Sequence, residues 1–291
     1  MAALSNIAAR RRLGRGRKIT SAALATAALA GLASLPPQSG TLAADLAPAH
    51  VATPTLATPA LARDWSLTIT PYMWASSLKG DAALLGIPAR VDVPFSQTLR
   101  EMQFGVMGGA ELRVGKFGAY VNGEYAKVAS SKHLKRLTLG VGMKNYLVSG
   151  GIYYRLYEAA LGGNTVFGRP RVFAIEPTVG LRWSNLESKV RNGNIALSVK
   201  QDWLDPFVGT RVTYDISDRW NFAMEADVGG FGAGTRLSVN AQGAIGYRTI
   251  LLGVPTTLRA GYRVLHQDYR DASFTWKVTQ HGPIIGAAMQ F

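Results

Sequence analysis

The sequence predicts an all-β protein, an antiparallel transmembrane β-barrel of about ten strands, and three observations support this prediction. Successive segments alternate apolar and polar side chains, which gives each strand one greasy and one polar face. The chain ends in such a segment, 283–291, and its last residue is the aromatic Phe291. Residues 1–43 have the pattern of an export signal. Apolar terminal strands also close soluble β-sandwiches, so a periplasmic sandwich stays open as the alternative fold.

The export signal has three parts. A basic head of six residues lies between Arg10 and Lys18, an apolar alanine-rich stretch runs from 19 to 35, and Thr41-Leu42-Ala43 offers a cleavage site. An inner-membrane anchor helix is the alternative for this stretch, although Pro36-Pro37 interrupts it early. We therefore divide the chain into a signal peptide at 1–43, an Ala/Pro-rich periplasmic linker at 44–63 and a barrel at 64–291.

Charge is best counted after removal of this signal. The chain has 32 Lys and Arg and 18 Asp and Glu; six of the basic residues and none of the acidic ones precede Ala43, which leaves 26 against 18, a net charge of +8. The cluster at 132–136 is expected in an exposed loop facing lipopolysaccharide. No basic stripe predicts a nucleic-acid partner. With no cysteine in the chain, neither disulfides nor thiolate metal sites are expected.

The alternating segments can be followed along the chain. They are 65–74, 104–114, 117–125, 137–147 with its extension 153–157, 173–183, 207–214, 220–228, 237–247, 258–265 and 283–291. An even number of strands places both termini on the periplasmic side. Residues 90–93 are either a further short strand or part of a long first loop with a helical turn at 96–102, so eight or twelve strands remain alternatives.

Connection lengths predict the orientation of the barrel. Short turns are expected on the periplasmic side and longer loops outside. The short connections are 115–116, 215–219 and 252–255; the long ones are 77–103, 129–136 and 187–200; and 160–170 is a long connection on the side where short ones are expected. Aromatic residues at strand ends are expected to form interfacial girdles, or else reflect the general preference of strands for aromatics. They are Trp65, Trp74, Tyr125, Trp183, Tyr214, Trp220 and Tyr262.

The inward-facing side chains form the candidate functional site. By alternation, eleven charged residues are expected to point into the lumen: Glu111, Arg113, Glu124, Lys144, Glu176, Arg182, Arg211, Glu225, Asp227, Arg259 and Arg263. Acids and bases are nearly matched, so they are expected to pair and to constrict or fill the lumen. The alternative is a narrow path for solutes lined by these charges.

No catalytic, metal or cofactor motif is apparent. Four histidines occur, and His266 and His281 are expected near each other at the outer ends of the last two strands. A loop between them contains Asp268, Asp271 and Ser273, so a hydrolase-like grouping is conceivable, with polar rim residues as the alternative. We expect no enzyme activity, no metal and no cofactor.

Several short motifs resemble a family of small Gram-negative outer-membrane β-barrel proteins. They are Pro71-Tyr72-Met73-Trp74-Ala75 with Gly80, Val91-Asp92-Val93-Pro94-Phe95-Ser96, Phe104-Gly105-Val106-Met107, Gly261-Tyr262-Arg263, Asp268-Tyr269 and His281-Gly282-Pro283 with Phe291. The resemblance covers roughly 64–291 and implies a barrel in the outer membrane, without an assigned activity. Phe291 resembles the terminal signal read by the barrel-assembly machinery, which implies that machinery as a transient partner.

Three functions follow as hypotheses. The first is an envelope-structural barrel or a narrow, porin-like passive channel in the outer membrane, in contact with outer-membrane lipids and lipopolysaccharide. The second is an outer-membrane lipid-modifying hydrolase. The third is a surface binding protein that acts through the loops 77–103 and 187–200.

Overall fold

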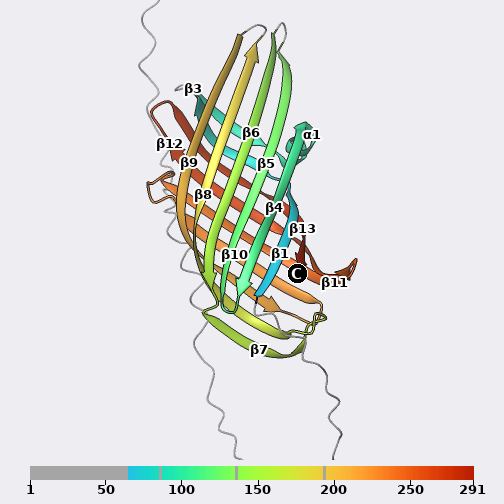
Figure 1. Ribbon diagram of the computed structural model, residues 1–291. Coiled ribbons are helices and arrows are strands. Elements are labelled where there is room, and N and C mark those ends of the chain that lie inside the picture. The colour runs from blue at the N-terminus through green and yellow to red at the C-terminus, as the bar shows by residue number, and fades with distance from the viewer. Residues whose placement is uncertain (1–64, 85–86, 135–136, 193–194) are drawn as a thin grey trace, which may run out of the picture. The chain divides into compact units, whose positions relative to one another are not determined.

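The computed structural model describes residues 65–291 except 85–86, 135–136 and 193–194 (Figure 1). The predicted signal peptide, its cleavage site and the linker lie outside the described residues. The elements are β1 (Trp65–Trp74), β2 (Ser77–Leu84), β3 (Ile87–Val93), α1 (Phe95–Glu101), β4 (Met102–Val114), β5 (Phe117–Leu134), β6 (Leu137–Tyr154), β7 (Tyr157–Asn164), β8 (Pro170–Asn192), β9 (Ile195–Asp215), β10 (Trp220–Gly229), β11 (Leu237–Leu251), β12 (Val254–Arg270) and β13 (Phe274–Gln290). Within these ranges no helix is long and apolar enough to cross a membrane.

Ten of the strands form a closed antiparallel ring. Its order is β1-β4-β5-β6-β8-β9-β10-β11-β12-β13, and β1 pairs with β13 to close it. The seam reaches the last residue: the Phe291 N–H donates to the Leu67 carbonyl at 2.8 Å, and the Leu67 N–H donates to the Phe291 carbonyl at 3.2 Å. At the level where all ten described strands pair, closure removes the open edges of the sheet. The predicted fold class and the predicted number of ring strands are confirmed.

The first predicted loop, 77–103, is largely ordered into secondary structure. β2 pairs with the part of β13 beyond β1, and β3 folds back on β2. The helix α1 then leads into β4. The two interpretations of this segment are therefore both realised, because a short strand covers 90–93 and a helix covers most of 96–102.

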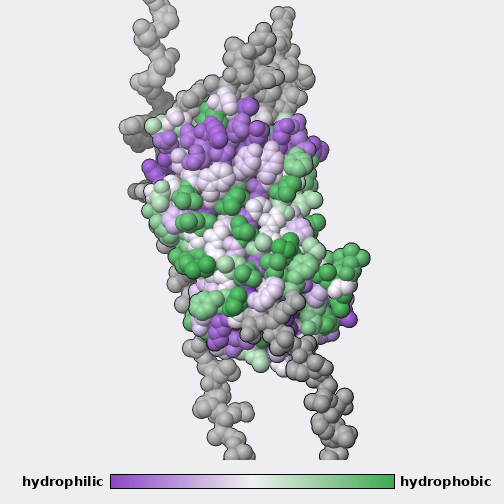
Figure 2. Space-filling view, viewed as in Figure 1, coloured by the Kyte–Doolittle hydropathy of each residue, from purple (hydrophilic) through white to green (hydrophobic). Residues whose placement is uncertain are grey.

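The outward face carries an apolar band with a sharp upper limit. On β8 and β9, the outward pair Trp183 and Leu204 is 37% and 47% exposed, and the outward pair two residues further on, Asn185 and Asp202, is polar. Figure 2 shows this band as a mainly hydrophobic zone with hydrophilic zones above and below it. Exposed apolar side chains over the height of a β-barrel are the surface that hydrocarbon requires.

Aromatic side chains mark the edges of this band. Trp65, Tyr214 and Trp220 are exposed near its lower edge, and Tyr262 is exposed on β12. Tyr125 and Tyr146 are in contact across β5 and β6, with ring centroids 4.6 Å apart. The prediction for Trp74 was wrong: its side chain is inside the barrel, 2% exposed, because it occupies the inward parity of β1.

Two hairpins, β5–β6 and β8–β9, extend far beyond the band. β8 and β9 have 23 and 21 residues, about twice the 9–11 that a tilted membrane strand needs. The prediction of outer loops at 129–136 and 187–200 was therefore wrong, because the strands of both hairpins continue through most of these residues (Figure 1). Backbone pairing needs only a partner strand, so it does not stop where lipid contact stops.

The opposite end of the barrel has short connections. Val114 pairs with Phe117 across 115–116, and Leu251 pairs with Val254 across 252–253, so these two turns have two residues each. The long connection at 160–170 is explained by β7, which pairs with the beginning of β8 as an additional strand outside the ring.

Candidate functional site: a charged lumen

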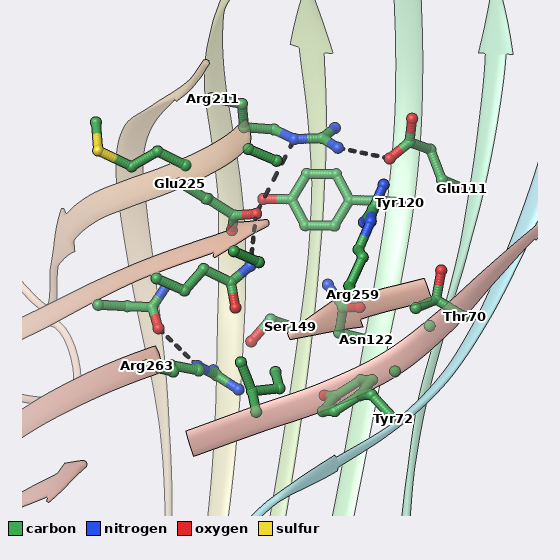
Figure 3. Close-up of a pocket in the computed structure, with 18 of the residues that line it drawn as sticks. Thr70, Tyr72, Glu111, Tyr120, Asn122, Ser149, Arg211, Glu225, Arg259 and Arg263 are labelled. Atoms are coloured by element: carbon green, nitrogen blue, oxygen red, sulfur yellow. Dashed lines mark hydrogen bonds and ion pairs between the residues drawn. The ribbon is translucent and has the colours of Figure 1, made fainter. Parts of the chain in front are cut away.

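Ten of the eleven predicted lumen residues, all except Lys144, have inward-facing side chains. They alternate with exposed apolar residues, as on β8, where buried Arg182 lies between exposed Leu181 and Trp183. Figure 3 shows five of them, Glu111, Arg211, Glu225, Arg259 and Arg263, converging on the interior from different strands.

Lys144 is placed elsewhere. It shares the outward parity of β6 with exposed Val148 and Ile152, and its Nζ lies 3.2 Å from Glu187 Oε2 on β8. The prediction of an inward Lys144 was therefore wrong. Lys144 lies beyond the apolar band, where polar side chains face outward to water.

The lower lumen contains a network centred on two glutamates. Glu111 accepts hydrogen bonds from Arg211 Nη2 at 2.6 Å and from the Tyr153 hydroxyl at 2.6 Å. Glu176 Oε1 lies 2.9 Å from both Arg113 Nη1 and Arg155 Nε. Charge-assisted hydrogen bonds of this kind make buried ions tolerable, since each loses its hydration on folding.

Above the lower network lies a second network of charge-assisted hydrogen bonds. Both carboxylate oxygens of Asp227 accept from Arg182 Nη2 at 2.9 Å, and Asn240 Nδ2 donates to Asp227 Oδ2 at 2.8 Å. Asn240 Oδ1 in turn accepts from Arg263 Nε at 2.9 Å. Arg263 also pairs with Glu124, which accepts a further bond from the Tyr72 hydroxyl at 3.1 Å. The result is a continuous chain of polar contacts from β8 to β1.

Two ion pairs join strands that are far apart in the ring. Arg211 on β9 meets Glu111 on β4, although β5, β6 and β8 lie between those strands. Arg263 on β12 meets Glu124 on β5, with β13, β1 and β4 between. Contacts between non-neighbouring strands run through the interior of the ring, so these side chains cross the lumen rather than line its wall.

Apolar side chains fill the lumen above the charged layers. One cluster combines Trp203 of β9 and Leu186 of β8 with Trp276, Val278 and other residues of β13 and β2. The indole of Trp203 stacks on the ring of Tyr269 with centroids 4.6 Å apart. A smaller cluster of Trp74, Leu147 and Leu265 lies between walls of the barrel in the same way. Facing walls are thus joined by hydrophobic contacts.

Glycines make room for this packing. A Cβ atom on Gly118 of β5 would lie 2.0 Å from Cζ of Tyr153, and one on Gly180 of β8 would lie 2.5 Å from Cζ of Phe207. Both rings support arginines: Arg211 lies 4.3 Å from the Tyr153 centroid and Arg182 lies 4.9 Å from that of Phe207. The rings therefore lie flat against neighbouring strands and position the cations above them.

A polar cavity of about 170 Å³ remains between the charged layers. Its lining includes Glu111, Tyr120, Arg211, Glu225 and Arg259 (Figure 3). Gln242 Nε2 donates to Glu225 at 3.2 Å, and Arg211 Nε lies 4.0 Å from the same carboxylate.

Four charged groups of the lumen were missed by the sequence reasoning. Arg248 pairs with Asp215 near the lower end of the barrel, and Arg155 contacts Glu176 from the connection between β6 and β7. Asp205 is completely buried and accepts from the Thr235 N–H at 2.6 Å. Asp215 and Arg248 continue the inward parity of β9 and β11, so longer strand assignments predict them. Arg155 lies outside any strand and has no such signal.

The histidines of the last strands do not form a triad. His281 Nδ1 lies 2.7 Å from the Tyr262 hydroxyl, and His266 Nδ1 lies 2.9 Å from Thr279 Oγ1. Asp268 pairs with Arg270 at 2.7 Å. Across the part of the chain that the structure describes, neither histidine is bonded to a carboxylate, so the grouping with Asp268, Asp271 and Ser273 is not assembled.

The architecture is similar to that of solved outer-membrane proteins. The outer membrane protease OmpT from Escherichia coli aligns over 79% of this chain and 97% of its own, with 9% identity and a TM-score of 0.49. Ail, the attachment invasion locus protein of Yersinia pestis, aligns over 78% and 98%, with 12% identity and a TM-score of 0.32. Neisserial surface protein A aligns over 78% and 97%, with 13% identity and a TM-score of 0.33. No protein-family model and no curated protein matches the chain.

Proposed function

We propose that this chain is an envelope-structural protein of the bacterial outer membrane, a barrel closed along its axis rather than a standing pore. The observation that carries the proposal is the crossing of the lumen by the Arg211–Glu111 and Arg263–Glu124 pairs. The apolar cluster around Trp203 supports it, because it joins opposite walls above those pairs. A conducting barrel instead keeps its charges along the wall around a wet axis.

The outward face supports the membrane location. The apolar band is bounded below by exposed aromatics such as Trp65 and Trp220 and above by polar residues such as Asp202. With a closed antiparallel ring, every ring strand finds its backbone partners without water, which is what hydrocarbon requires. The expected export signal is consistent with transport to this membrane.

Lipopolysaccharide is the lipid partner we propose. Just above the band, one row of outward side chains runs across four strands; we call Lys127, Lys144, Glu187 and Lys200 the charged row. Lys127 and Lys144 are directly opposite each other, and Glu187, 3.2 Å from Lys144, is the single acid of the row against three lysines. Lys189 adds a fourth lysine, 3.1 Å from Glu187, so positive charge remains in excess. Phosphate groups of the outer leaflet would balance that excess.

Conductance across a planar bilayer tests the closed lumen. We expect purified wild-type protein to be silent. A variant with Arg211→Ala, Glu111→Ala, Trp203→Ala and Trp276→Ala loses a crossing pair and the apolar closure, and we expect it to carry ion current. The matched control, Lys144→Ala with Glu187→Ala, removes an outward pair and should stay silent. A steady ohmic current through the wild type would overturn the proposal in favour of a passive channel.

A further inference from the structure

Arg259 is the lumen arginine without a carboxylate partner. Within the described ranges, every other predicted lumen arginine contacts an acid: Arg113 with Glu176, Arg182 with Asp227, Arg211 with Glu111 and Arg263 with Glu124. Arg259 makes no such contact in the same part of the chain, and its Nε is buried without a hydrogen-bond partner there. A cation inside the barrel without a carboxylate partner is costly, so this site has a demand for negative charge.

Glycines flank Arg259 on both neighbouring strands. On β12 it lies between Gly246 of β11 and Gly286 of β13, its register partners on the two neighbouring strands. Neither neighbour has a side chain that reaches the guanidinium. The side chain instead extends among Tyr120, Asn122 and Ser149 into the lumen cavity (Figure 3).

The cavity has a suitable size and chemistry for a small anion. Its volume of about 170 Å³ is many times the roughly 10–15 Å³ that one water needs. A second donor is at hand, because Arg211 Nη1 is also buried and has no partner among the described residues. Two carboxylates of the lining oppose an anion here, and both are already engaged: Glu225 accepts from Gln242 at 3.2 Å, and Glu111 accepts from Arg211 and Tyr153 at 2.6 Å.

We propose that this cavity is a binding site for a small oxyanion, such as inorganic phosphate or a short carboxylate, with Arg259 as its main ligand and Arg211 Nη1 as the second donor. The anion supplies the charge that Arg259 lacks and stabilises the closed barrel by mass action. The site is independent of ion conduction. A silent barrel can hold the anion, and a conducting barrel can lack it.

Inorganic phosphate is the probe we would use, with full-length mature protein in detergent and ionic strength held constant with chloride, which is not an oxyanion. Phosphorus NMR line width and the urea midpoint of unfolding are measured against phosphate concentration. We expect the wild type to broaden the signal and to show a rising midpoint. Arg259→Gln keeps hydrogen-bonding capacity but loses the charge, and it should abolish both responses.

Two further variants make the result decisive. Arg236→Gln removes an exposed arginine and should respond like the wild type, which excludes a general effect of charge. Glu225→Gln removes one of the two opposing carboxylates and should tighten phosphate binding several-fold, a test that holds even if Arg259→Gln fails to fold. Equal responses in wild type and Arg259→Gln, no response in the wild type, or no tightening in Glu225→Gln would each overturn the proposal.

Discussion

Arg182 Nη2 lies 2.9 Å from both carboxylate oxygens of Asp227, and the two residues are only 1% and 5% exposed. They sit on β8 and β10, so the pair spans β9 on the inside of the barrel. Neither ion is accessible to water, so each depends on the other for compensation of its charge.

Removing one partner of this pair is expected to be more harmful than removing both. Arg182→Met leaves Asp227 charged and buried, and we expect it to lower the free energy of unfolding by about 3–5 kcal/mol. The double variant Arg182→Met with Asp227→Leu should recover part of this loss. Urea unfolding in lipid vesicles measures the free energy of unfolding of these variants and of Asp227→Leu alone. If the loss in the double variant equals the sum of the losses in the two single variants, the ions do not act as a pair.

Gly118 is predicted to be intolerant of a side chain. A methyl group there would lie 2.0 Å from Cζ of Tyr153, whose hydroxyl donates to Glu111. We expect Gly118→Ala to cost about 1–3 kcal/mol through overpacking. Gly123→Ala on the same strand is the matched control, since no atom lies within 4 Å of the position of its Cβ. Equal unfolding midpoints for the two variants would contradict this account.

Phe291 allows assembly to be separated from stability. Its backbone exchanges two hydrogen bonds with Leu67, and its side chain is exposed on the band. Phe291→Ala keeps the backbone hydrogen bonds, so we expect nearly wild-type stability after refolding in vitro. We also expect less folded protein in the outer membrane, measured on gels as the fraction whose mobility shifts on heating. Deletion of Phe291 should lower both. The barrel-assembly machinery is expected to recognise the aromatic side chain of Phe291. An undiminished yield for Phe291→Ala would argue against that role.

The charged row predicts how strongly lipopolysaccharide is held. Replacing Lys127 and Lys144 by Gln removes two adjacent cations above the band, and we expect several-fold less lipopolysaccharide to co-purify, with a weaker dependence on salt. Lys116→Gln, in a turn at the opposite end of the barrel, is the control. Unchanged lipopolysaccharide content would remove the charged row from the proposal.

Leu252 offers a stabilising substitution. It is 97% exposed and has φ = 50° in a two-residue turn, followed by Gly253 with φ = 81°. Asn tolerates this left-handed conformation better than Leu, so Leu252→Asn should raise the free energy of unfolding by about 1 kcal/mol. Leu252→Ala also shortens the side chain but keeps the strain, and it should show no comparable gain.

The strands of the apolar band were predictable from the sequence because lipid fixes the meaning of alternation there: apolar side chains face out and polar ones face in. Above the band the rule inverts. Trp203 and Trp276 face the lumen, whereas Lys144 and Glu187 face outward to water. Alternation continues without indicating which solvent touches which face, so the sequence alone predicts the wrong face for Lys144 and does not show how far the strands continue.

The same alternation predicts the candidate site only in part. Alternation placed Arg182, Asp227 and Arg259 on the inward face, but it carries no information on which acid meets which base across the ring. That depends on strand order and stagger, which bring Arg211 and Glu111 together over a separation of 100 residues. The missing partner of Arg259 is likewise a property of the assembled ring alone.

The seam between β1 and β13 has a consequence for biosynthesis. The first ring strand, β1, pairs with the last, β13, so the ring cannot close before β13 has been made. Until then the seam edge of β1 has no partner strand, and the apolar outward faces of the earlier strands are exposed to water. The protein is therefore expected to depend on periplasmic holding chaperones throughout its passage.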